Sequence, residues 1–249
     1  MRIAVAGGTG VVGRHTVDAV RAGGHEAVVL SRSHGVDLVT GRGLDAALDG
    51  ADAVIDVASI ETLKASAAIE FFTAATGNLV SAAGDAGVGH VVLLSIVGID
   101  RIPYDYYAGK VAQEKVVEAS RVPWTILRAT QFHEFAEQMF ERAKLGPLHL
   151  APNARTQPVS AREVGERLAA LAAGGPQGRV RDLAGPREER LADMIRAFAR
   201  REGYRGWIPA LNVPGPQMAG MRAGLALPGP DADLGRQTFA EWLAADSRP

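Results

Sequence analysis

The sequence predicts an α/β protein in which helices cover both faces of a parallel β-sheet. Short apolar runs alternate with helical stretches through residue 128, and a glycine-rich turn joins the first run to the first helix. After about residue 130, helices are separated instead by loops rich in proline and glycine. We therefore expect a smaller, irregular and mainly helical C-terminal lobe, packed over the carboxyl edge of the sheet.

The expected elements follow from apolar periodicity and from glycines that end each run. The expected strands span residues 2–6, 26–30, 36–39, 53–57, 91–94 and 124–127. The expected helices of this part span residues 10–22, 44–48, 67–86 and 110–119. The C-terminal part has expected helices at 134–143, 161–172, 188–201 and 238–244.

The composition argues against several classes of protein. The chain has 249 residues, with 27 basic and 28 acidic side chains and 47% hydrophobic residues, which argues against disorder and against a dedicated nucleic-acid binder. It has no cysteine, which removes disulfides, thiolate catalysis and cysteine-ligated metals. The histidines lack metal-site spacing, so we expect no metal. Without a targeting segment or a membrane-length apolar stretch, we expect a cytoplasmic protein without membrane contact.

The glycine-rich turn has the pattern G-x-x-G-x-x-G directly after the first strand and at the start of the first helix. Its residues are Gly7, Gly8, Thr9, Gly10, Val11, Val12 and Gly13. Glycines allow a tight turn and a close approach of backbone N–H groups to a pyrophosphate, and the helix N-terminus favours the anion. The pattern predicts a Rossmann-type, doubly wound fold that binds a dinucleotide.

The end of the second strand bears on the choice of dinucleotide. Folds selective for NAD usually place Asp or Glu here, whereas this chain has Ser31, Arg32 and Ser33. An arginine can pair with a 2′-phosphate, so these residues favour NADP(H) over NAD(H) as cofactor, with a solvated loop arginine as the alternative. Val57 and Ala58, at the end of a neighbouring strand, are expected to complete the cofactor contacts.

A second group of polar residues follows the strand at 91–94. Ser95 comes directly after that strand, and Tyr106 and Lys110 follow with a spacing of four, which puts both on one face of a helix. The position of Ser95 is the sheet edge where ligands bind in open α/β sheets.

Six segments in this order carry a family resemblance: V-A-G-G-T-G-V-V-G-R, L-S-R-S, D-A-V-I-D-V-A, L-L-S-I-V-G-I-D, Y-Y-A-G-K-V-A-Q-E and P-W-T-I-L-R-A-T-Q-F. The chain resembles the short-chain dehydrogenase/reductase superfamily over most of its length, and within it the atypical NmrA-like NAD(P)H-binding branch. The resemblance implies that Tyr106 donates a proton to a substrate carbonyl and that Ser95 polarises that carbonyl. It also implies that Lys110 binds the nicotinamide ribose and lowers the pKa of the tyrosine, and that Asn78 serves a proton relay.

The short linker between Ser95 and the tyrosines departs from the family pattern because it contains Pro103. This leaves open whether Tyr106 or Tyr107 is the catalytic ring, or whether Tyr106 only packs and Lys110 only holds the ribose. Gln131, Phe132 and His133 follow the strand at 124–127 and are expected either to contact substrate or to pack as a loop.

We expect one Rossmann-type domain over residues 1–249, with a nucleotide-binding core at about 1–130 and 158–185 and a substrate lobe at about 131–157 and 186–249. An apolar group in the lobe has three open explanations, namely core packing, closure of the substrate pocket or a homodimer face: Trp207, Met218, Met221 and Leu225.

The expected function is NADP(H)-dependent transfer of hydride between nicotinamide and a small apolar or aromatic carbonyl or quinone-like substrate. Two alternatives remain on the same fold. One is an NADP(H)-sensing regulator without turnover, and the other is a lyase or epimerase that keeps its cofactor.

Overall fold

Five parallel strands from the first 129 residues form the main part of one sheet. They are β1 (Arg2–Ala6), β2 (Glu26–Leu30), β3 (Ala53–Asp56), β4 (His90–Ile96) and β5 (Trp124–Ala129). The computed structural model describes residues 1–62, 64–102, 104–145 and 148–245. The sheet order is β14-β11-β5-β4-β3-β1-β2, with β10 also paired to β5. Its outer strands are β10 (Gly178–Arg179), β11 (Leu183–Ala184) and β14 (Asp233–Leu234).

The order of the strands locates the ligand-binding edge. The chain passes from β1 to β2 on one side and then crosses to β3 on the other side of β1. Such a switch point opens a crevice at the carboxyl ends of the strands. The glycine turn follows β1 and therefore lies at this crevice, as the predicted doubly wound fold requires.

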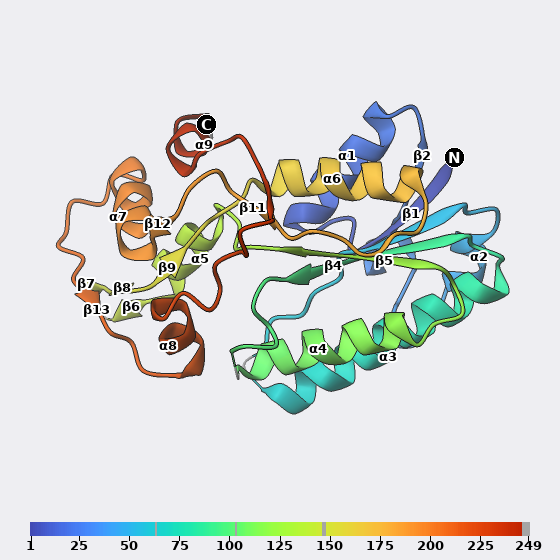
Figure 1. The fold of residues 1–249 in the computed structure, drawn as a ribbon, viewed down its shortest axis with the longest axis horizontal. Coiled ribbons are helices and arrows are strands. Elements are labelled where there is room, and N and C mark those ends of the chain that lie inside the picture. Colours follow the sequence, from blue (N-terminus) through green and yellow to red (C-terminus); the bar gives the residue numbers. More distant parts are fainter. Residues whose placement is uncertain (63, 103, 146–147, 246–249) are drawn as a thin grey trace.

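Helices cover both faces of the sheet, which confirms the predicted fold class (Figure 1). The helices α1 (Val11–Ala22) and α6 (Ala161–Gly174) lie on one face, and α3 (Ala65–Asp85) and α4 (Asp105–Glu118) lie on the other. Glycines let both pairs approach closely: a Cβ on Gly109 of α4 would lie 2.7 Å from the Ala68 side chain of α3, and one on Gly165 of α6 would lie 2.7 Å from the His15 backbone. The short α2 (Leu44–Leu48) leads into β3.

The C-terminal lobe combines short helices with two-residue strands. Its helices are α5 (Phe135–Arg142), α7 (Leu191–Arg201), α8 (Pro216–Arg222) and α9 (Phe239–Ala245). Its strand pairs are β6 (Lys144–Leu145) with β7 (Leu148–His149), β8 (Ala151–Pro152) with β13 (Ala210–Leu211), and β9 (Arg155–Thr156) with β12 (Glu189–Arg190). These strands and α8 were not predicted. Figure 1 shows the lobe at one end of the sheet.

Residues 36–39 do not form the expected strand. They belong to a turn in which Asp37 Oδ1 accepts hydrogen bonds from the N–H of Val39 and, at longer range, of Thr40. Asn78 Nδ2 donates to the carbonyls of Leu38 and Val39 at 2.9 and 2.8 Å. The donor group of Asn78 therefore secures this turn, and the proton-relay role expected for Asn78 stays a prediction.

The structure offers no helix long and apolar enough to cross a membrane within the residues it describes.

Candidate functional site

The glycine turn forms a tight cradle that side chains would fill. Gly7 has a φ of 76°, and a Cβ there would lie 2.9 Å from the Ala58 backbone and from the Val57 carbonyl oxygen. A Cβ on Gly13 would lie 2.1 Å from the Gly7 carbonyl oxygen. Both positions therefore exclude side chains, because a heavy atom cannot approach backbone so closely. Val57 and Ala58 form one wall of the cradle, and their expected contact with a cofactor stays a prediction.

The first turn of α1 leaves N–H groups for an anion. Gly10 N–H donates to the Gly7 carbonyl and Arg14 N–H donates to the Gly10 carbonyl, each at 3.0 Å. The N–H groups of Val11, Val12 and Gly13 have no backbone acceptor in the described residues. Free N–H groups at a helix N-terminus bind phosphate groups, so the cradle fits a pyrophosphate.

The residues after β2 form a small polar cluster around a free guanidinium. Arg32 begins the 3₁₀ turn η1 (Arg32–His34), is exposed, and has no ion-pair partner in the described part of the chain. Ser31 Oγ lies 2.9 Å from Ser33 Oγ and 2.8 Å from His34 Nδ1. The cluster thus offers hydroxyl, imidazole and guanidinium groups to a phosphate. His34 was not predicted, since a lone histidine in a loop gives no signal in the sequence.

Helix α4 begins at Asp105, five residues before the expected start at residue 110, and therefore carries both Tyr106 and Lys110. Tyr106 is half-buried, and its hydroxyl lies 2.8 Å from Ser59 Oγ. Its ring packs edge-on against Phe72 at a centroid distance of 5.6 Å. Ser59 was missed by the sequence analysis, although its position two residues after the strand at 53–57 could have indicated it.

Tyr107 points into the lobe. Its side chain is 3% exposed, and Gln131 Nε2 approaches its hydroxyl at 3.5 Å. Burial raises the pKa of Tyr107 to about 12, against hydrogen bonds from Gln217 and Gln131. This environment is that of a packing residue, and it leaves Tyr106 as the better placed of the two rings. Pro103, which the sequence analysis singled out, lies outside the described residues.

The Lys110 side chain is buried between helix α4 and strand β4. Its Nζ donates to the Leu94 carbonyl oxygen at 2.8 Å and to Gln113 Oε1, and it lies 4.9 Å from the Phe72 ring centroid. Burial lowers the pKa of Lys110 to about 8, although the charges of Asp56 and Glu114 oppose this.

The expected lowering of the Tyr106 pKa by Lys110 is not found. Burial raises the pKa of Tyr106 above its usual range, with the hydrogen bond from Ser59 opposing this and Tyr104 adding to it. Lys110 has no part in this shift, because its ammonium is bound to Leu94 and Gln113 on the inner side of α4. At neutral pH, the Tyr106 hydroxyl is therefore protonated.

Ser95 lies at the end of β4, as predicted, but its side chain is only 1% exposed. Its Oγ has no hydrogen-bond partner of good geometry within the described residues, although it is close enough to Glu114 to help lower the pKa of that carboxyl. Burial alone would raise the pKa of Glu114. The main cause of its lowered pKa is Arg128, which donates two hydrogen bonds to the carboxylate at 2.9 and 2.8 Å. Ser95 thus lies beside a buried ion pair.

The three expected substrate residues lie in different surroundings. His133 is fully buried and packs against the stacked rings of Phe239 and Trp242, with its Nε2 3.1 Å from the Gln237 carbonyl oxygen. Phe132 packs against the sheet core, and Gln131 bonds to Thr156 and Tyr107. The contacts of Phe132 and His133 favour the loop-packing alternative, because both rings are occupied by protein neighbours.

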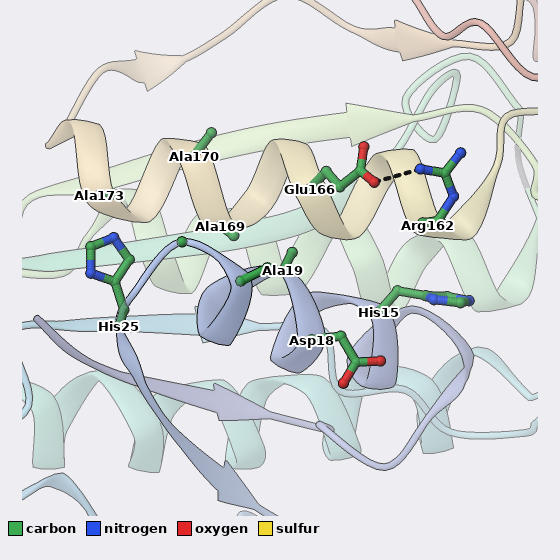
Figure 2. A pocket seen from close by; sticks show the side chains of 11 residues that line it. His15, Asp18, Ala19, His25, Arg162, Glu166, Ala169, Ala170 and Ala173 are labelled. Carbon is green, nitrogen blue, oxygen red and sulfur yellow. Dashed lines mark hydrogen bonds and ion pairs between the residues drawn. The ribbon is translucent and has the colours of Figure 1, made fainter.

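A surface groove of about 430 Å³ runs between α1 and α6. In Figure 2, His25 lies at one end and His15 with the Arg162–Glu166 ion pair at the other. Its floor is formed by alanines of both helices, including Ala19 and Ala169. None of the predicted cofactor or catalytic residues lines this groove. The candidate site is therefore the switch-point edge and not this hollow.

Comparison with known proteins identifies a family for this chain. A family model described as NAD(P)H-binding matches residues 7–173, which is more than half of the chain. The chain belongs to the NAD(P)H-binding family. This confirms the expected NAD(P)H-binding family, whereas a place in the NmrA-like branch of the short-chain dehydrogenases/reductases stays a prediction. A comparison with curated protein sequences finds no match.

Solved structures share the fold of this NAD(P)H-binding protein at low sequence identity. An NADPH-dependent quinone oxidoreductase from Escherichia coli, complexed with NADPH, is 18% identical with a TM-score of 0.71, covering 97% of this chain and 98% of that one. A Thermus thermophilus UDP-glucose 4-epimerase with NAD is 20% identical with a TM-score of 0.68, covering 98% and 100%. A short-chain dehydrogenase/reductase superfamily protein from Agrobacterium tumefaciens with bound NAD is 17% identical with a TM-score of 0.67, covering 98% and 95%. At these identities the likeness establishes the fold and not the reaction.

Proposed function

We propose that this protein is an NADP(H)-dependent oxidoreductase that transfers hydride between nicotinamide and a small apolar or aromatic carbonyl or quinone-like substrate. The observation that carries the proposal is the convergence of three groups at the carboxyl edge of one sheet: the glycine cradle, the free Arg32 cluster, and helix α4 with Tyr106 and Lys110. The resemblance to quinone oxidoreductase in fold supports the same reading.

The cofactor contacts are assigned from the groups that have free donors. The N–H groups of Val11, Val12 and Gly13 would hold the pyrophosphate, and Arg32 with Ser31 would hold the 2′-phosphate. Lys110 would donate to the nicotinamide ribose. NADPH, when bound, supplies the hydride and the chain supplies its orientation.

Tyr106 is assigned as the proton donor. Its hydroxyl is protonated at neutral pH, because the usual pKa of tyrosine is about 10 and burial raises it further, and Ser59 Oγ lies 2.8 Å away. Partly buried apolar side chains lie in the same cluster as Tyr106, among them Ile96, Phe135 and Met139. They would exclude water and favour an apolar substrate. We place the substrate between the core at about 1–130 and 158–185 and the lobe at about 131–157 and 186–249. Ser95 reaches a substrate carbonyl only after its side chain rotates away from Glu114.

The reaction is tested with a Tyr106→Phe variant and NADPH oxidation against a panel of quinones and aromatic carbonyls. We expect a loss of at least about 100-fold in turnover, because a general acid contributes about 10² to 10⁴, with NADPH affinity unchanged within about twofold. Tyr107→Phe is the matched control, and a larger loss there would transfer the role to Tyr107. Wild-type binding of NADPH without oxidation by any panel member would favour the sensor. Conversion of a substrate without net loss of NADPH would favour an epimerase or lyase.

Cofactor preference is tested with Arg32→Asp. The NADPH dissociation constant should rise by at least about tenfold while that for NADH stays within about twofold, because only NADPH carries the 2′-phosphate. Arg121→Asp is the control, since Arg121 is exposed in the turn before β5 at the opposite edge of the sheet. Equal losses for both nucleotides would remove the assignment of Arg32 to the 2′-phosphate.

A further inference from the structure

Four buried polar side chains form a connected network of hydrogen bonds beside the candidate site. Asp56 ends β3, Thr76 comes from α3, and Lys110 and Gln113 come from α4. Their exposed fractions are 1%, 1%, 4% and 0%. Buried polar groups are costly unless every donor and acceptor is paired, so the pairing of each atom is informative.

The side-chain amide of Gln113 has a carboxylate on one side and an ammonium group on the other. Its Nε2 donates to Asp56 Oδ2 at 3.0 Å and lies 2.9 Å from Thr76 Oγ1, and its Oε1 accepts from Lys110 Nζ. A carboxylate only accepts and an ammonium only donates. The amide of Gln113 therefore has one satisfactory orientation, with its NH₂ group toward Asp56 and its oxygen toward Lys110.

This orientation determines the direction of the lysine. Two of the three Nζ donors are used by the Leu94 carbonyl and by Gln113, and no third oxygen acceptor is found among the described residues. Because the ammonium is tetrahedral, two fixed acceptors also fix the third N–H. Without the Gln113 oxygen, the long lysine side chain would lose one of these two constraints.

The same carboxylate also supports the glycine cradle. Asp56 Oδ1 accepts from the Ala58 N–H at 3.0 Å, and a Cβ on Gly7 would lie 2.9 Å from the Ala58 nitrogen. Asp56 thus holds the segment that packs on Gly7 with one oxygen and the Gln113 amide with the other. It joins the expected pyrophosphate cradle to the expected ribose lysine.

We propose that Gln113, oriented by Asp56 and Thr76, is a positioning residue that directs the third N–H of Lys110 toward the nicotinamide ribose. The inference rests on the proposed function, because it needs NADP(H) at the switch-point edge. Gln113 touches neither cofactor nor substrate, and it acts only through Lys110.

The test compares two ligands that differ at the ribose. NADPH contains the nicotinamide ribose, whereas adenosine 2′,5′-bisphosphate has the 2′-phosphate without that ribose. In Gln113→Met, we expect the NADPH dissociation constant to rise about tenfold and that of the bisphosphate to stay within about twofold. Equal losses for both ligands, or no change for either, would overturn the positioning role.

A second variant examines the orientation itself. Asp56→Asn keeps the shape. Its amide oxygen still accepts from the Ala58 N–H, so its NH₂ group replaces the oxygen that faced Gln113. The Gln113 amide then turns over, and its NH₂ group faces Lys110. We expect the same selective loss of NADPH affinity as in Gln113→Met. This variant also replaces Gln113→Met if circular dichroism shows that the latter does not fold. Retention of wild-type NADPH affinity in Asp56→Asn would contradict the proposal.

A double-mutant cycle separates positioning from general damage. In a Lys110→Met background, Gln113→Met should cause no further loss of NADPH affinity, whereas an additive second loss would overturn the proposal. Thr125→Val is the matched control, because Thr125 is a fully buried threonine near the start of β5 that bonds to His90 and Gln177. It should lower the melting temperature without changing either affinity. If the wild type binds neither ligand, the proposed function fails. If the wild type binds both ligands and the variants show no selective loss of NADPH affinity, only the role of Gln113 is removed.

Discussion

The sheet core and the C-terminal lobe are stabilised in different ways. The core strands β1, β3 and β4 are four to seven residues long and almost entirely buried, with long helices on both faces. The lobe has two-residue strands, and contacts between aromatic side chains far apart in the sequence help to hold it together, such as His133 with Trp242 and Phe140 with Phe198. Regular elements give a rigid edge for a cofactor, whereas the lobe depends on a few long-range contacts. The two regions should therefore respond differently to substitution.

The largest expected effect is at the core edge. Gly13→Ala places a Cβ 2.1 Å from the Gly7 carbonyl oxygen, so the turn must open and the free N–H groups of α1 lose their arrangement. We expect no measurable NADPH binding by calorimetry. Gly77→Ala is the control, because nothing lies within 4 Å of its Cβ position on α3. It should leave binding unchanged and add about 0.5 to 1 kcal/mol of stability. Normal binding by Gly13→Ala would mean that the cradle is not the nucleotide site.

The lobe should lose stability without loss of nucleotide binding. Trp242 of α9 is 9% exposed and packs on His133 and Phe239. Trp242→Ala should cost about 3 to 5 kcal/mol and remove the hydrogen-exchange protection of α9. Trp207→Ala, where the side chain is 75% exposed, should change stability by less than about 0.5 kcal/mol. If Trp242→Ala lowered the free energy of NADPH binding by as much as it lowered the free energy of unfolding, lobe and core would form one cooperative unit.

Acid should weaken the lobe through one buried histidine. Burial lowers the pKa of His133 to about 4, with the Gln237 carbonyl opposing this. The unfolded chain takes up this proton near pH 6.5 and the folded chain only near pH 4, so stability is complete above pH 6.5 and falls as the pH drops toward 4. The loss is up to about 3 kcal/mol. Denaturant unfolding of wild type and His133→Phe between pH 7 and pH 4 measures it. Equal pH slopes in the two proteins would show that His133 contributes nothing.

The smallest expected effect concerns Asn78. Asn78→Ala removes two hydrogen bonds to the turn at residues 36–39, at a cost of about 1 to 2 kcal/mol. Turnover with NADPH should stay within about twofold per folded molecule. A loss of 100-fold or more in turnover, with the melting temperature unchanged, would support the proton-relay role.

The sequence predicted the core well because its signals are local. Buried strands are continuous apolar runs, and the glycine turn lies between a strand and a helix in a spacing that chance does not favour. The strand expected at 36–39 was wrong because the hydrogen bonds that Asp37 accepts and Asn78 donates outweighed the β-branched composition of that segment. The lobe strands were missed because two residues are too few for any periodicity.

The candidate site could be predicted only where one segment defines it. The turn at residues 7–13 and the pair Tyr106 and Lys110 are readable from spacing. Two contacts of the site join segments that are far apart in the sequence. The hydroxyls of Ser59 and Tyr106 are 47 positions apart, and the Gln113 amide and the Asp56 carboxylate are 57 positions apart. The contact of Gln113 with Lys110 lies within one helix, but it depends on the same packing against the strands. Such contacts exist only once the strands have paired.

The amino-acid sequence alone determined the fold class, the switch-point cradle and the family, because each depends on glycine geometry and on short-range apolar periodicity. The tertiary structure alone decided that Lys110 is bound inward, that Tyr107 and His133 are buried, and that the pKa of Tyr106 is raised. Burial and charge at a side chain are sums over neighbours from many parts of the chain, so they are set by the packing of the whole molecule and not by any one segment.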